Sequence, residues 1–168
     1  MTEELNVKNG MKIWEYGADI LRSAGMKQEK NFRQHNMVSC FDHSVSVAMM
    51  SLFIAEKLKL SIDERSLVRG ALLHDYFLYD WHDRENRWRN MHGITHAYEA
   101  LSNAERDFGL NDTERDIIKK HMFPVTPILP TCRESVIVTI ADKICAMRET
   151  CMPQNPVLQV CQMVKPGK

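Results

Sequence analysis

The sequence carries no excess of either charge, since 22 Lys and Arg residues balance 22 Asp and Glu residues in a chain of 168. Proteins that hold nucleic acid by bulk electrostatics normally have a basic excess, so we expect no nucleic-acid partner, although a local basic patch is still allowed. The chain also lacks an apolar run of membrane-span length. Its polar start, MTEELNVKNG, is unlike a secretory signal, so we expect no membrane partner either.

Cysteine is present without a pairing pattern. The five Cys are an odd number and include no Cys-x-x-Cys pair. This usage is typical of reduced thiols, so we expect a cytoplasmic protein. At 168 residues the chain can bury a core without disulfides, and its length predicts one domain.

Strand-like patterns are nearly absent, and the apolar residues repeat at helical spacing. The segments with this spacing are 11–24, 38–59 and 93–107. Further helix starts are predicted where Ser, Thr or Asn precedes Glu by three residues, as in a capping box. These pairs are Ser61 with Glu64, Asn111 with Glu114 and Thr131 with Glu134. Residues 25–36 and 79–91 are polar and predict loops. The pattern therefore predicts an all-α fold of about six or more helices.

Two acidic residues lie in helical contexts where a carboxylate needs an explanation. His74 and Asp75 follow an apolar run, and adjacent helical side chains point about 100° apart, so both can approach one metal ion. Asp142 lies on the apolar row of VIVTIADKICAM, where a carboxylate is costly unless it is paired or bound to metal. A helix end reaching solvent and a salt bridge to Lys or Arg remain the alternatives.

Four other His residues have an ordinary explanation when each is taken singly. His43 inside the 38–59 helix is typical of a hydrogen-bonded core His. His92 and His96 are four residues apart and can share a helix face, but the Glu of the zinc-protease motif is missing. His121 ends a helix, where a cation is favourable.

The order of these residues along the chain is more specific than any of them alone. The order is His43, His74-Asp75, His92, His121, Asp142. It resembles the H…HD…H…H…D signature of the HD-domain metal-dependent phosphohydrolase superfamily, and the likeness runs from about Val38 to Glu149. The resemblance implies an HD-domain helical bundle at 38–150, with an N-terminal helix and loop at 1–37 packed on it and a C-terminal tail at 151–168, all in one domain.

The resemblance also implies a set of metal ligands. The first ion would be held by His43, His74, Asp75 and Asp142, and Asp75 would bridge to a second ion held by His92 and His121. Mixed imidazole and carboxylate ligands favour Fe, Mn, Ni or Zn, and the number of ions, one or two, stays open. His96 stands where many relatives have Gly, so we keep it as a further ligand or a supporting group.

The implied activity is hydrolysis of a small phosphoester, such as a nucleotide or dinucleotide, by attack of a metal-bound hydroxide on phosphorus, with His74 and Asp75 as catalytic residues. Many relatives have a Lys shortly after the HD pair, which is absent here. Phosphate contacts would then come from Lys143, which is also a catalytic candidate, or from the cluster of Arg84, Arg87 and Arg89. The candidates for the pocket mouth are Asp80, Trp81 and His82.

Two other functions stay open. One is a non-catalytic metal- or nucleotide-sensing module, which the missing Lys favours. The other is a di-iron oxygenase of the HD type. The GYP extension of some relatives is absent, because residues 122–131 read MFPVTPILPT, so cyclic-di-GMP hydrolysis is not implied. A homodimer is also allowed.

Overall fold

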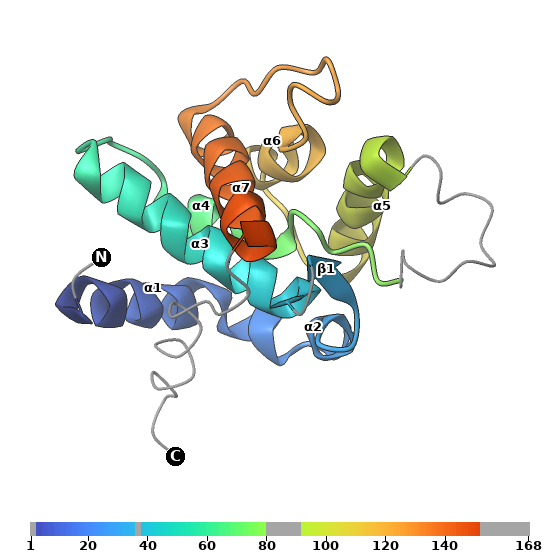
Figure 1. The fold of residues 1–168 in the computed structure, drawn as a ribbon, viewed down its shortest axis with the longest axis horizontal. Coiled ribbons are helices and arrows are strands. Elements are labelled where there is room, and N and C mark those ends of the chain that lie inside the picture. The colour runs from blue at the N-terminus through green and yellow to red at the C-terminus, as the bar shows by residue number, and fades with distance from the viewer. Residues whose placement is uncertain (1–2, 36–37, 80–91, 152–168) are drawn as a thin grey trace.

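The computed structural model describes residues 3–35, 38–79 and 92–151, without the side chains at 35 and 92–94. Seven helices and one two-stranded antiparallel sheet lie in these ranges (Figure 1). The elements are α1 (Glu3–Arg22), α2 (Ala24–Glu29), β1 (Arg33–His35), β2 (Val38–Ser39), α3 (Cys40–Lys57), α4 (Glu64–Leu73), α5 (His92–Asp107), α6 (Asp112–Lys120) and α7 (Arg133–Cys151). The all-α prediction is confirmed, and so is the number of helices.

The centre of the bundle is α3, which packs against α1, α4 and α7 (Figure 1). Its sequence is apolar on most sides, and twelve of its residues are buried. Helix α4 is buried between α1, α3 and α6. Gly70 allows the close approach of α4 to α6, because a Cβ atom there would lie 2.5 Å from Ile117 Cδ1. The run VIVTI lies within α7, as the sequence predicts.

Three local predictions were wrong. Helix α4 is capped by Asp63, whose side chain accepts from the Ser66 N–H, and not by Ser61. Thr131 does not cap α7, because its hydroxyl donates to Asp116 and its predicted partner Glu134 accepts from the backbone N–H of Asp63. The predicted loop at 25–36 contains most of α2 and β1. The Asn111–Glu114 capping box is confirmed.

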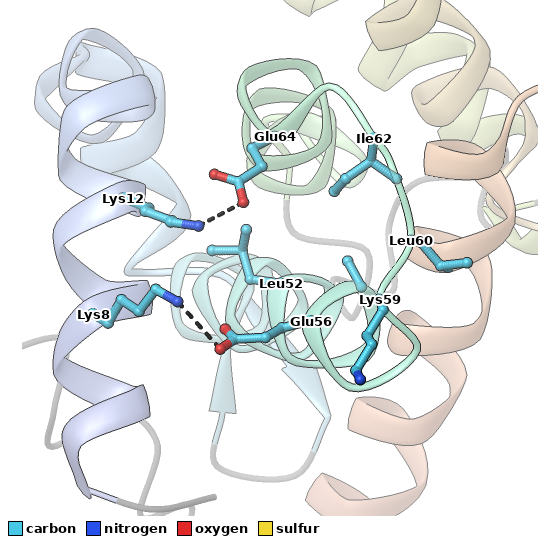
Figure 2. A pocket seen from close by; sticks show the side chains of 9 residues that line it. Lys8, Lys12, Leu52, Glu56, Lys59, Leu60, Ile62 and Glu64 are labelled. Atoms are coloured by element: carbon cyan, nitrogen blue, oxygen red, sulfur yellow. Dashed lines mark hydrogen bonds and ion pairs between the residues drawn. The ribbon is translucent and has the colours of Figure 1, made fainter.

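Helix α1 extends to Glu3, well before the predicted start, and joins the bundle at its edge by ion pairs (Figure 2). Lys8 pairs with Glu56 of α3 at 3.2 Å, and Lys12 pairs with Glu64 of α4 at 2.5 Å (Figure 2). The cavity between these helices has a volume of about 230 Å³. Its lining contains Lys, Glu and aliphatic side chains but none of the His residues of the predicted metal site.

None of the helices in the described ranges combines the length and the apolar character that a bilayer span needs.

Candidate metal centre

Two of the predicted His residues lie at helix C-termini in the same way. His74 follows α4 and His121 follows α6, each as the C-cap residue. The Nδ1 atom of each ring donates a hydrogen bond to the carbonyl three residues earlier, Ala71 O and Ile118 O, both at 2.8 Å. With the Nδ1 proton engaged, the Nε2 lone pair of each ring points toward the opposite side. The ends of the two helices thus present two imidazoles whose Nε2 atoms can hold a metal ion.

The first group of donor atoms joins α3, α4 and α7. His43 Nε2 lies 3.1 Å from Asp142 Oδ1 and 3.9 Å from Asp75 Oδ2. His74 Nε2 lies 3.5 Å from Asp75 Oδ2 and 3.8 Å from Asp142 Oδ1. The rings of His43 and His74 and the carboxylate of Asp75 can therefore hold an ion between them, and Asp142 lies against both rings.

The second group of donor atoms joins α5 and α6 to the same aspartate. His96 Nε2 and His121 Nε2 lie 3.3 and 3.4 Å from Asp75 Oδ1. The two Nε2 atoms lie 3.1 Å from each other. These three side chains are buried and can hold an ion as well. Asp75 thus offers Oδ2 to one group and Oδ1 to the other.

The orientation of Asp75 is fixed by a side chain from β1. Gln34 Nε2 donates to Asp75 Oδ2 at 2.5 Å. Gln34 Oε1 in turn accepts from the Cys40 thiol at 3.3 Å, so the amide nitrogen must face the aspartate. The small sheet therefore connects the start of α3 to the HD pair.

Both ring nitrogens of His43 lie within hydrogen-bond distance of carboxylates. Its Nδ1 lies 2.8 Å from Glu149 Oε2, on the side away from Asp142. Burial would lower the pKa of His43, but the hydrogen bonds with Asp142 and Glu149 outweigh it and raise the pKa to about 10. A carboxylate on Nδ1 of a metal-binding imidazole is the arrangement that orients such ligands in metal centres.

The remaining ionisable groups have the charges that suit a cation site. Burial lowers the pKa of His74 to about 4, so this ring is neutral at pH 7. Burial would raise the pKa values of Asp75 and Asp142, but the neighbouring imidazoles outweigh it and lower both. Two ionised carboxylates are thus buried beside the neutral ring of His74, and a cation balances such a charge.

Buried polar atoms without hydrogen-bond partners are a second feature of the centre that fits a metal ion. His74 Nε2 and Asp75 Oδ1 are buried and have no hydrogen-bond partner within the described part of the chain. The imidazole nitrogens that lie 3.3 and 3.4 Å from Asp75 Oδ1 lack hydrogen-bond geometry toward it. Buried polar atoms without partners are costly, and coordination to an ion satisfies these two atoms.

The structure brings together five of the six predicted ligands. These are His43, His74, Asp75, His121 and Asp142. The sixth, His92, is the first residue of α5, but its side chain lies outside the described residues. His96, which the sequence left as a further or supporting group, lies within the cluster. The other pocket and phosphate candidates, Asp80, Trp81, His82, Arg84, Arg87 and Arg89, also lie outside the described residues.

Lys143 lies at the edge of the centre. Its Nζ donates to the backbone carbonyl of His121 at 2.9 Å and lies 3.5 Å from Asp142 Oδ2. Its side chain is 38% exposed, so it places a positive charge between the buried ligands and the solvent.

Sequence reasoning missed three residues next to the ligands. Glu149 was detectable, since it lies seven residues after Asp142 and two helical turns place both on one face of α7. Gln34 gave no signal, because its contact with Asp75 spans 41 residues. Glu29 is fully buried at the end of α2, and burial, followed by the charge of Asp75, raises its pKa well above the usual value.

Comparisons with known proteins agree with this geometry. A family model described as HD domain matches residues 40–147, which is more than half of the chain. A ribonuclease Y from Pseudothermotoga lettingae is 29% identical over 137 residues, covering 82% of this chain. The matched part is 24% of that protein's length, so the chain corresponds to less than a third of this curated relative. No solved structure matches the chain.

Proposed function

The chain belongs to the HD domain family, and from that premise we propose that it is a divalent-metal-dependent phosphohydrolase that cleaves a small phosphoester such as a nucleotide. The observation that carries the proposal is the position of Asp75, whose two carboxylate oxygens face separate groups of imidazoles. The chemistry that divalent ions supply in such a setting is polarisation of phosphoryl oxygens and a lower pKa for water.

Hydrogen bonds within the centre orient the imidazoles that would bind a metal ion. His74 and His121 are fixed by their Nδ1 hydrogen bonds to Ala71 O and Ile118 O, so that Nε2 of each ring is the atom that would bind a cation. His43 must lose its Nε2 proton for the same purpose, while its Nδ1 proton stays on the ring and is hydrogen-bonded to Glu149. Binding of an ion is therefore coupled to release of a proton from His43.

Three features of the chain favour a phosphoester as the substrate. The cluster consists of imidazoles and carboxylates, which favours water as the nucleophile. Lys143 is held by the His121 carbonyl near Asp142 and is partly exposed, so its ammonium group is available to a phosphate oxygen. The balanced net charge of the chain favours a small substrate over a long nucleic acid.

The test is turnover by protein that has been stripped with a chelator and reloaded with Mn²⁺, Fe²⁺, Ni²⁺ or Zn²⁺. The substrates should be mononucleotides, dinucleotides and short RNA, the last because a relative is named a ribonuclease. We expect hydrolysis of a small phosphoester with at least one metal. Asp75→Ala should lower kcat/KM by roughly a thousandfold, an effect in the range of losses when one centre of charge stabilisation is removed.

Asp112→Ala is the matched control, because it removes an exposed carboxylate from the first turn of α6. It should leave turnover unchanged. Metal binding without turnover of any substrate would contradict the proposal and favour a sensing module. Consumption of dioxygen by the Fe²⁺-loaded protein, without hydrolysis, would instead favour an oxygenase.

A further inference from the structure

A third imidazole lies against Asp75 and His121. His96 on α5 is 4% exposed, and its Nε2 atom contacts both the carboxylate and the neighbouring ring. We propose that His96 is itself a metal ligand, which with Asp75 Oδ1 and His121 Nε2 forms the site of a second ion. This inference rests on the proposed metal-dependent function, but it concerns ion binding and not turnover.

The three donor atoms have the spacing of ligands around one ion. The triangle of His96 Nε2, His121 Nε2 and Asp75 Oδ1 has edges of 3.1, 3.3 and 3.4 Å. Ligands at about 2.0–2.1 Å from a tetrahedral ion are about 3.3 Å from one another. Imidazole and carboxylate also match the ligand preferences of Zn, Fe, Mn and Ni.

The direction from which His96 approaches separates a ligand from a supporting group. Supporting groups in this centre contact the Nδ1 atoms of the rings: Glu149 on His43, Ala71 O on His74 and Ile118 O on His121. His96 instead points its Nε2 at the Nε2 of His121 and at Asp75 Oδ1. It therefore occupies the side of His121 where an ion binds.

Without an ion, this arrangement satisfies its atoms poorly. The Nδ1 atom of His121 donates to Ile118 O, so in this tautomer its Nε2 is an acceptor. His96 can donate one Nε2 proton to it, which leaves Asp75 Oδ1 buried and without a hydrogen bond among the described groups. A shared cation satisfies all three atoms at once. The ring of Phe77 packs edge-on against the ring of His96, with 6.1 Å between the ring centroids, and restricts its movement.

The experiment compares ion binding by the native chain and by variants at the two His residues of α5. Mn²⁺ or Zn²⁺ is titrated into chelator-stripped protein, and the ions per chain and their dissociation constants are measured by calorimetry and elemental analysis. We expect two ions for the native chain. His96→Ala should keep the first ion and weaken the second by roughly 100-fold or more, as loss of one of three protein ligands implies.

Further variants at His96 distinguish the loss of a metal ligand from misfolding of the protein. His96→Gln keeps a side chain of similar polarity but is a poor transition-metal ligand, and it should behave as His96→Ala. His96→Glu restores a ligand and should recover the second ion. Glu99→Ala, on the exposed side of the same helix, is the control and should bind as the native chain does.

The outcomes separate this inference from the proposed function. Two ions with unchanged constants in both His96→Ala and His96→Gln would overturn it. Loss of the second ion in His92→Ala alone would overturn it too, and would assign the site to His92. A native chain that binds one ion and still hydrolyses a phosphoester would remove the second site but not the phosphohydrolase. If the native chain binds two ions, His96→Ala loses the second ion and no substrate is turned over, the result would support the second site and not the phosphohydrolase.

Discussion

Single residues next to the ligands decide how the ligands are held. Glu149 contacts His43, whose two ring nitrogens both face carboxylates. Its hydrogen bond keeps the proton of His43 on Nδ1, so that Nε2 is the atom turned toward Asp142 and Asp75. Residues that orient a ligand in this way usually affect metal affinity almost as much as the ligands do.

We expect Glu149→Gln to weaken binding of the first ion by roughly 10- to 100-fold, because a neutral amide orients and polarises the imidazole less well. In the metal-free protein the same change should lower the pKa of His43 from about 10, since one of the two carboxylates that raise it is removed. Calorimetry measures the first effect, and NMR titration of the His43 ring measures the second.

Glu99→Gln is the control, since it makes the same chemical change on the exposed face of α5. If Glu149→Gln binds metal within about threefold of the native affinity, the carboxylate only fills space and does not position His43.

At this scale the sequence predicts ligands better than their supports. The ordered pattern picks out His43, His74, Asp75, His121 and Asp142, because their order along the chain matches the signature of the family that the sequence resembles. Helical spacing alone cannot rank His92 against His96, since two residues four apart share a helix face equally well, and only the resemblance favours His92. It cannot find Gln34 at all, because a contact between a short strand and a helix end follows no periodicity.

The elements show the same division between their interiors and their ends. Helix interiors follow from apolar spacing, as VIVTI in α7 illustrates. Helix starts failed where the capping side chains had tertiary partners instead. Thr131 donates to Asp116 of α6, and Glu134 accepts from the N–H of Asp63, so neither is available to cap its own helix. These contacts depend on how α4, α6 and α7 pack, and a local pattern cannot contain that information.

The junction of α6 with the segment before α7 depends on the charge of Asp116. Its carboxylate accepts from the hydroxyl and the backbone N–H of Thr131, at 2.5 and 3.0 Å, and pairs with Lys120. Burial would raise the pKa of Asp116, but these contacts outweigh it and lower the pKa from 3.8 to about 2. A folded-state pKa below the unfolded value means that the carboxylate stabilises the fold above about pH 4 and that this stability is lost as the pH falls toward 2.

We expect Asp116→Asn to lower the free energy of unfolding by about 1–2 kcal/mol at pH 7, allowing for partial exposure to solvent. The difference from the native chain should shrink steadily between about pH 5 and pH 2, where the native carboxylate becomes protonated. Urea unfolding at a series of pH values measures it. Asp112→Asn, fully exposed on the same helix, should show almost no difference. A constant difference at all pH values would mean that the geometry of Asp116 matters and not its charge.

At the scale of the whole molecule, the centre is where segments distant in the sequence meet. Its side chains come from α3, α5 and α7, from the C-cap residues of α4 and α6 and from Asp75, which follows α4. The sequence predicts that such a meeting occurs, because the resemblance orders the ligands along the chain. The convergence itself depends on long-range packing, in which α3 touches α4 and α7 while α6 touches α4, α5 and α7.

An ion held by side chains from several helices links them in the folded state and not in the unfolded chain. Binding at about 100 times the dissociation constant adds about 2.7 kcal/mol to the free energy of unfolding. For a chain of this size each kcal/mol is worth about 2–4 °C in Tm, so each ion removed with a chelator should lower Tm by about 5–10 °C. Scanning calorimetry with and without the chelator measures the shift. Asp75→Ala should be insensitive to the chelator, because the carboxylate shared by both groups of donors is gone. An equal Tm for native chain with and without ions would mean that the cluster does not bind them in the folded state, and that its buried carboxylates are balanced by protons on His43 and its neighbours instead.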